Sequence, residues 1–275
     1  MLIRLLRNEW IKCSNDKALL FILFLPAVYP WYFVFEQYLK TDIRLINDID
    51  SGQNDIRNIY LLLYHKIYIT YVFLILPLST TFLISFYGRT MLKKKELSTL
   101  MVYPAALVSI TKSKLISLCA LVIVSGIIFY LSTQTALFLL FKFKPQLSLY
   151  IITLSVWDVF SLTFLYQLIF IFLSLPVAFL CYIMALKFRY AILLNLIISV
   201  LLLILGLLNT VLAKISLFIF PFKYYMNIAQ KLRRDLVPPA PGNIPLDSIW
   251  LLSTVIFTML LSYLIHRMIL NYEDK

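Results

Sequence analysis

The chain has 275 residues, of which 62% are hydrophobic and only 14% are charged. With a mean hydropathy of +0.90, this composition lies outside the range of a soluble globular domain. The formal net charge of +12 would suggest nucleic acid in a soluble protein, but the basic residues cluster at the ends of apolar runs. Membrane topology explains that placement better, so we predict an all-α polytopic membrane protein with no nucleic-acid partner.

Motifs for catalysis, metal binding and nucleotide binding are absent from the sequence. The cysteines Cys13, Cys119 and Cys181 are widely spaced and form no CxxC pair, which disfavours disulfide and metal roles. There is no G-x-x-x-x-G-K-[ST], H-E-x-x-H or G-x-S-x-G motif, and no charged residue deep in an apolar run to relay protons. We predict that the chain is not an enzyme, binds no cofactor or metal, and cannot drive transport alone.

Residues 1–17 predict an amphipathic helix that lies in the cytoplasmic interface of the membrane. A signal peptide is the alternative, but the apolar run that follows ends in Glu36-Gln37-Tyr38 without a small-residue cleavage site, so we predict a permanent span. One side of the helix carries Leu2, Ile3, Leu6, Trp10 and Cys13, and the other carries Arg4, Arg7, Asn8 and Lys12.

Six apolar runs are predicted to cross the hydrocarbon core, which is about 30 Å thick. Pro26 and Pro30 should bend the first of them. With only five glycines in the chain and no GxxxG motif, little room is expected for close helix crossings of the GxxxG type. The predicted spans are residues 18–39, 67–87, 115–141, 160–186, 191–212 and 249–265.

The segments between these spans on the outer side are polar or broken by proline. Residues 40–66 predict an exterior loop with a short helix near 56–64, and its four aspartates match no EF-hand spacing, so we predict a solvated loop. Residues 142–158 are interpreted as an interfacial segment. Residues 213–248 combine a short aromatic run with a proline-rich turn, which favours a broken or interfacial helix and an outer loop.

Several polar residues lie within the predicted spans and are candidates for lining a transport path. The alternative is that they bond to their own backbone or to neighbouring helices, as such residues often do in membranes. The candidates are Thr133, Gln134, Gln167, Asn195 and Asn209.

Residues 88–114 interrupt the apolar sequence with a strongly basic segment. Short basic loops beside spans stay in the cytoplasm, and the density of basic residues favours a cytoplasmic position for both termini. Within the segment we predict a short helix over 90–103 that ends before Pro104, and a second helix that begins near Ser109. The simplest alternative is a positive-inside loop whose lysines lie against anionic headgroups. The basic residues are Arg89, Lys93, Lys94, Lys95, Lys112 and Lys114.

The order of residues in this segment resembles the loop between the first two hairpins of type-2 ABC transporter permeases. The matching positions are Glu96, Leu97, Thr99, Leu100, Met101, Pro104 and Lys114, whereas Ser98 stands where that family often has glycine. The N-terminal order Arg-Asn-Glu-Trp-Ile-Lys, with Glu9, Trp10 and Lys12, looks like the elbow helix that begins many of these permeases.

The resemblance implies the membrane-spanning permease subunit of an ATP-driven exporter in the bacterial cytoplasmic (inner) membrane. In that family the loop is a coupling helix seated in a groove of a separate ATPase, which binds ATP and Mg, and two permeases, copies or relatives, work together among membrane lipids. Similarity to lantibiotic-protection and bacteriocin-export permeases implies an amphipathic peptide cargo, with lipid-linked or drug-like molecules as alternatives. The competing class is a membrane-embedded transferase or scaffold whose basic loop binds anionic headgroups.

Overall fold

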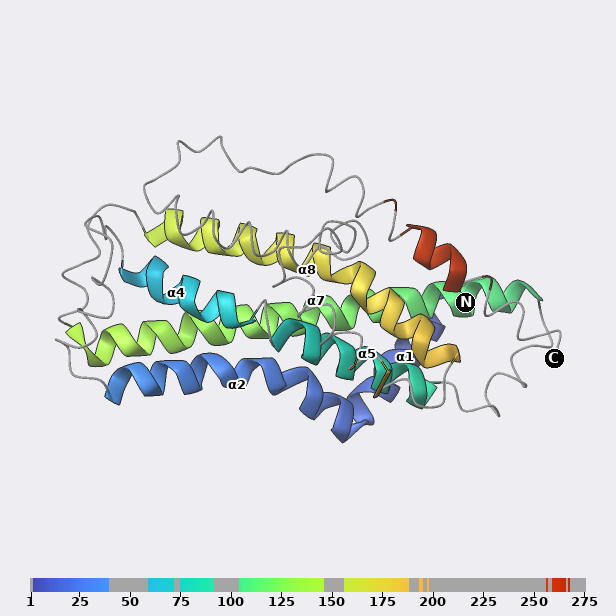
Figure 1. Cartoon of the computed structure of the whole chain (residues 1–275). Helices are drawn as coiled ribbons and strands as arrows, with labels where there is room; N and C mark the ends of the chain where they lie inside the picture. Colours follow the sequence, from blue (N-terminus) through green and yellow to red (C-terminus); the bar gives the residue numbers. More distant parts are fainter. Residues whose placement is uncertain are drawn as a thin grey trace.

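The computed structural model describes residues 2–39, 59–71, 75–91, 104–145 and 156–187, together with residues 193–194, 197, 256, 259–265 and 267. All regular secondary structure within these ranges is helical, so the prediction of an all-α fold is confirmed for the described residues. The helices are α1 (Leu2–Asn15), α2 (Lys17–Leu39), α4 (Ile59–Thr70), α5 (Leu76–Met91), α7 (Pro104–Phe143) and α8 (Val156–Lys187) (Figure 1).

Two helices in the described part of the chain are long and apolar enough to cross a membrane by length and composition. They are Lys17–Leu39 and the Lys112–Phe143 portion of α7, which contain the predicted spans 18–39 and 115–141. The predicted span 249–265 is described only in part, while most of 191–212 and all of the outer segment 213–248 lie outside the described residues. The count of six spans therefore stays a prediction.

A capping residue separates the predicted interfacial helix from the first long helix. The Asp16 carboxylate Oδ1 accepts hydrogen bonds from the backbone N–H groups of Ala18 at 3.1 Å and Leu19 at 3.2 Å. An aspartate at this position satisfies donors that the first turn of a helix leaves open. Further along α2, Pro26 and Pro30 lie inside the helix, and the helix is bent along its length as expected from the missing backbone donors (Figure 1).

The predicted second span is built from two helices, α4 and α5. α4 begins at Ile59, so residues 59–66, which the sequence placed in a loop with a short helix, belong to a longer helix. Its buried tyrosines recur every four residues at Tyr64 and Tyr68, one helical turn apart. Pro77 stands in the first turn of α5, where the missing N–H of proline is tolerated, whereas it would break the interior of a helix.

α7 is one continuous helix of 40 residues. The prediction that its helix begins near Ser109 is wrong, because it begins at Pro104. Proline is restrictive for the residue before it but favourable at the start of a helix, where its fixed φ angle already suits helical geometry. α8 likewise takes in residues 156–158, which the sequence assigned to the interfacial segment.

The helices form an elongated bundle in which α2 packs along α7 and α5 packs along α8 (Figure 1). One end of the bundle holds α1, the end of α5, the start of α7 and the end of α8. The other end brings Tyr38 near Phe143, with ring centroids 6.2 Å apart. The loop that carries the predicted coupling helix therefore leaves the bundle at the end where α1 lies.

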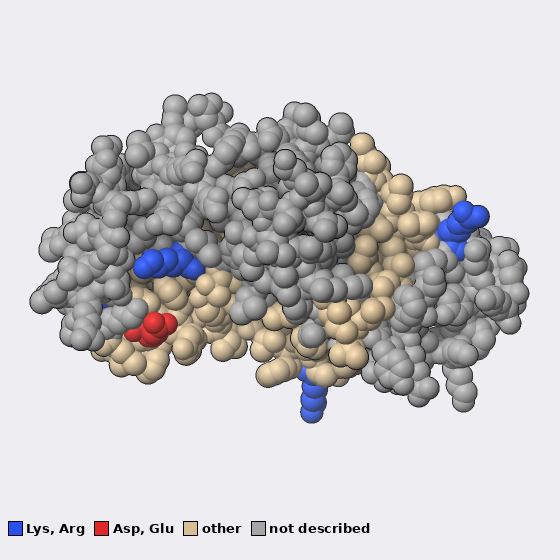
Figure 2. All heavy atoms as spheres, viewed as in Figure 1, with Lys and Arg blue, Asp and Glu red and all other residues tan. Residues whose placement is uncertain are grey.

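The outer side of α2 exposes large apolar side chains. Phe21, Tyr32 and Phe35 are 71%, 63% and 61% exposed. In water such a face would be costly, at about 25 cal/mol for each Å² of apolar surface. Figure 2 shows the described surface on one face of the molecule as mostly uncharged, with basic and acidic side chains as separate groups and no single charged patch.

Candidate functional site

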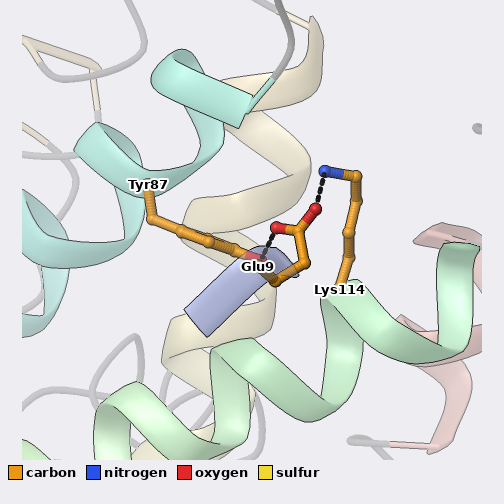
Figure 3. Close-up of polar contacts among 3 residues, drawn as sticks. All are labelled: Glu9, Tyr87 and Lys114. Atoms are coloured by element: carbon orange, nitrogen blue, oxygen red, sulfur yellow. Dashed lines mark hydrogen bonds and ion pairs between the residues drawn. The ribbon is translucent and has the colours of Figure 1, made fainter. Parts of the chain in front are cut away.

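A buried carboxylate lies at the end of the bundle from which the basic loop leaves. Glu9 of α1 accepts a hydrogen bond through Oε2 from the hydroxyl of Tyr87 at 3.1 Å. Its other oxygen, Oε1, lies 3.5 Å from the ammonium Nζ of Lys114, which donates to it. Figure 3 shows the carboxylate between the two partners, which come from α5 and α7. We call these three residues the Glu9 cluster.

Helical geometry explains why Glu9 points inward. Glu9 and Cys13 are one turn apart on α1 and are the buried residues of that helix, because residues four apart lie on the same face. Of the other charged residues of α1, Arg4 and Arg7 lie on the opposite, exposed side, and Lys12 is half-buried. A basic helix therefore carries its single acid on the side that faces the bundle.

Burial makes the ion pair sensitive to the loss of either partner. The side chains of Lys114 and Glu9 are only 7% and 10% exposed. Removing two charges from water costs several kcal/mol per ion, and the mutual attraction offsets this only where hydrogen bonds satisfy the groups. Here each carboxylate oxygen has a donor, so the cluster is a polar joint between α1, α5 and α7.

The thiol of Cys13 experiences the same local charges. Burial, with a smaller contribution from the Glu9 carboxylate, raises the pKa of Cys13 to about 11, and the Lys114 ammonium acts in the opposite direction. A thiol with so high a pKa is protonated under ordinary conditions and is a poor nucleophile or metal ligand. Within the described residues, no group of three His, Cys, Asp or Glu side chains could hold a metal ion.

Close contacts extend the cluster to α8. The rings of Tyr87 and Tyr182 stack with centroids 6.0 Å apart, and an ideal Cβ on Gly88 would lie 2.7 Å from the Cβ of Ala185. Real Cβ atoms do not approach that closely, so only glycine allows α5 and α8 to meet at this point. α8 is thus held against the same end of α5 that binds Glu9.

The cluster lies at the base of the predicted coupling loop. Tyr87 stands one turn before α5 ends at Met91, and Lys114 lies in the α7 helix that begins at Pro104. Both helices that enclose residues 92–103 are therefore attached to α1 through one carboxylate.

The structure places the residues predicted for the coupling loop and the elbow helix as follows. Pro104 begins α7, and Lys114, predicted to take part in ATPase coupling, turns its side chain to Glu9 inside the protein. On α1, Trp10 is 54% exposed and Lys12 is half-buried. Glu96, Leu97, Thr99, Leu100 and Met101 lie outside the described residues.

Sequence reasoning identified Glu9 and Lys114 separately but not their pairing, and it missed Tyr87. The two charged residues are 105 positions apart, beyond the reach of any local periodicity. The available signal was a lone acid in an otherwise basic helix, since an isolated charge of the minority sign on a packed helix needs a partner.

The candidates for a transport path make hydrogen bonds inside the bundle. The Thr133 hydroxyl donates a hydrogen bond to the Phe129 carbonyl of the same helix at 2.9 Å. Gln167 Nε2 donates to the Gly126 carbonyl at 2.7 Å. Gln134 donates to the Thr163 hydroxyl at 3.2 Å and accepts a hydrogen bond from the Tyr60 hydroxyl. The contacts of Gln134 and Gln167 thus join helices to one another, whereas that of Thr133 lies within α7. The role in a path stays a prediction. Asn195 and Asn209 lie outside the described residues.

Comparison with protein-family models, with curated proteins and with solved structures finds no match to this chain. The functional proposal therefore rests on the sequence features and on the geometry of the Glu9 cluster.

Proposed function

We propose that this chain is the membrane-spanning permease subunit of an ATP-driven ABC exporter. The observation that carries the proposal is the attachment of both ends of the predicted coupling loop to α1 through Glu9. A loop that only anchored the protein by its charge would need no such joint at its base. A loop that transmits force needs such a joint, because a displacement of its ends must be passed on to other helices.

The described contacts provide a route for such a displacement. From the loop, α5 reaches α8 through the Tyr87–Tyr182 ring contact and α1 through Glu9. α1 is followed by Asp16, which caps the start of α2, so movement of α1 bears on the first long apolar helix. Packed helices and buried hydrogen bonds are the means by which coupling passes between distant sites.

The energy source and the cargo lie outside this chain. In the proposed complex a cytoplasmic ATPase subunit binds ATP and Mg, and a second permease, a copy or a relative, completes the transport unit. The interior polar side chains Thr133, Gln134 and Gln167 are bonded within the described bundle, which favours a path between two permeases over one inside a single chain. The proposed cargo is an amphipathic peptide of the bacteriocin or lantibiotic kind, moved out across the bacterial cytoplasmic membrane.

Copurification of the ATPase with the tagged chain tests the proposal. We expect an ABC ATPase subunit to accompany the wild-type chain, and Glu96→Lys and Leu100→Ala to reduce its recovery at equal membrane levels. Truncating an interface anchor costs on the order of 2 kcal/mol or more, and reversing a charge places like charges in contact. Glu36→Lys is the matched control. It makes the same charge reversal at an exposed residue near the C-terminal end of α2, away from the predicted loop. Unchanged recovery and ATP hydrolysis in both loop variants would contradict the proposal.

A further inference from the structure

Lys66 is a basic residue within α4, a helix that packs against the two most apolar helices of the bundle, α2 and α7. The sequence placed it at the end of an exterior loop. Its neighbours Leu63 and Ile67 are 1% and 0% exposed, and Lys66 itself is half-buried. No ion pair of Lys66 is found among the described residues. The structure therefore places an ammonium group on a helix whose other side belongs to the core.

Ring contacts show how deep Lys66 lies along α7. Tyr60 contacts Phe141, near the C-terminal end of α7, with ring centroids 5.6 Å apart. Tyr68 contacts Phe129, in the middle of the apolar part of α7, at 5.7 Å. Lys66 lies between the two tyrosines, and the six residues from Tyr60 to Lys66 correspond to about 9 Å along the helix axis. Where α7 crosses a membrane, Lys66 thus lies within the hydrocarbon.

Two hydroxyl groups lie on the same side of α4 as Lys66. Thr70 follows one turn later on that side of the helix, and its hydroxyl donates to the Lys66 carbonyl at 3.5 Å. The Thr70 side chain also lies next to the hydroxyl of Tyr29 on α2. All three residues are half-buried. We call them the Lys66 seam, since they lie where α4 meets α2.

A cation at this depth needs a compensating partner. Charged side chains within a bilayer are costly, and they pair with an opposite charge or mark a binding site. Glu36, the only acid of α2, is exposed and lies about two turns beyond Tyr29, so it is not part of the seam. The seam itself consists of hydrogen-bond donors, which suit an anion.

We propose that the Lys66 seam binds the oxyanion of a lipophilic molecule, a carboxylate or a phosphate on an apolar body. The ammonium supplies the charge, and the hydroxyls of Thr70 and Tyr29 can turn their protons to the ligand. Beside Tyr29 on α2, Val28 and Tyr32 are 61% and 63% exposed and offer apolar surface to the rest of the molecule. Its role as cargo rests on the proposed function, whereas its binding rests only on the membrane placement of α2, α4 and α7.

Energy transfer from a single tryptophan to a fluorescent fatty acid tests the site in the full chain. Trp10→Phe, Trp157→Phe and Trp250→Phe leave Trp31, two residues from Tyr29, as the only tryptophan. The protein is purified in an uncharged maltoside detergent. It is then titrated with cis-parinarate, which carries a carboxylate, and with the uncharged methyl ester of the same acid.

Substitutions of Lys66 measure the contribution of its charge. We expect Lys66→Gln to weaken parinarate binding about tenfold or more and to leave the ester unchanged, because it removes a hydrogen bond from a charged donor. Lys66→Arg keeps the charge and should keep most of the affinity. Lys142→Gln removes an exposed positive charge near the end of α7 and is the matched control. Equal parinarate binding by the wild type and Lys66→Gln would overturn the proposal, as would equal affinity for the acid and its ester.

Two further measurements separate a built site from a lysine that merely extends toward the headgroups. Thr70→Val should weaken parinarate binding severalfold, since the seam loses a donor, and no change would overturn the role of the seam. Dodecanoate or dodecyl phosphate should displace parinarate, and the stronger competitor identifies the oxyanion. Equal displacement by dodecyltrimethylammonium would contradict an anion site. None of these readouts involves an ATPase, so failure here leaves the transport proposal to its own test.

Discussion

A single carboxylate, Glu9, joins three helices at one end of the bundle, and its energetics are those of a buried pair. Lys114 lies 3.5 Å from one oxygen, and both side chains are largely removed from water. Replacing both charges by apolar groups of similar volume is often tolerated in proteins, whereas removing one of them leaves the other unpaired in a medium of low polarity. The pairing thus predicts an asymmetry between single and double substitutions.

Glu9→Gln should destabilise the protein by about 3–5 kcal/mol, because the Lys114 ammonium loses its counter-charge while the glutamine keeps the volume. Glu9→Gln combined with Lys114→Met should recover much of that loss. Tyr87→Phe removes one hydrogen bond to a charged group and should cost about 1.5–3 kcal/mol. Thermal unfolding of the full chain in detergent measures all three. A Glu9→Gln protein as stable as wild type would show that the pair does not form.

Cys13 provides a probe of the same charges in solution. Its pKa of about 11 lies above its ordinary value of 9.0, so the folded protein holds the thiol proton where an unfolded chain would release it. The stabilising contribution is complete below 9.0 and is lost as the pH rises through about 11. Reaction of the thiol with a maleimide should follow the thiolate fraction and be slow until the pH approaches the raised value.

The charge variants should move this reaction in opposite directions. In a chain with Cys119→Ser and Cys181→Ser, Glu9→Gln should lower the pKa of Cys13 and speed labelling at a given pH. Lys114→Met should raise the pKa and slow it, because the carboxylate and the ammonium act on the thiol with opposite sign. The same change in rate for both variants would indicate local unfolding and would contradict the electrostatic origin of the shift.

At the scale of elements, helix boundaries are determined by residues close to them in the sequence, whereas contacts between helices are not. The bend at Pro26 and Pro30 is predicted from the sequence, because a proline acts within one or two turns. The Asp16 cap, found only in the structure, acts over the same short range. The start of α7 at Pro104 was misplaced, because proline both excludes a helix before it and favours one after it. The close approaches at Gly88 and Gly126 are not of the GxxxG type and could not be predicted, since a single glycine opposite a side chain leaves no motif.

Gly126→Ala tests the closest of these crossings. An ideal Cβ at this position would lie 2.4 Å from Ile171 Cγ1 and 3.0 Å from Gln167 Nε2, so the Ile171 side chain would have to move or α7 and α8 would have to separate. The hydrogen bond from Gln167 to the Gly126 carbonyl would be strained at the same time. We expect a loss of about 1–3 kcal/mol, as for other overpacked sites.

A second substitution provides the control for the crossing. Ile171→Ala removes the opposing side chain, so Gly126→Ala should cost less in the Ile171→Ala background than in the wild-type chain. Thermal unfolding of the wild type, the two single variants and the double variant gives the coupling free energy between residues 126 and 171 directly. Purely additive losses would mean that the two helices do not meet at this position.

For the whole molecule, the long apolar runs define the direction of the chain, because each run must pass from one end of the bundle to the other. The described helices follow this alternation: α2 and α7 run one way, and α5 and α8 run the other (Figure 1). The fold could therefore be predicted as far as its helical class and the order of its long helices. Which helices pack against each other could not be predicted. Lys114 and Glu9, for example, are 105 residues apart in the chain, and no local sequence pattern indicates such a contact.

The alternation gives a final prediction about sidedness. If the end of the bundle that holds α1 faces the cytoplasm, as the density of basic residues predicts, then both termini and Lys93 to Lys95 lie inside, and Ser51 and Pro239 lie outside. In a chain with Cys13, Cys119 and Cys181 replaced by serine, an impermeant maleimide should label Ser51→Cys and Pro239→Cys in intact cells. Lys94→Cys should react only after the cells are opened, because translocating a short, strongly basic loop is disfavoured. Labelling of Lys94→Cys in intact cells would invert the orientation, and the predicted loop would then face away from any cytoplasmic ATPase.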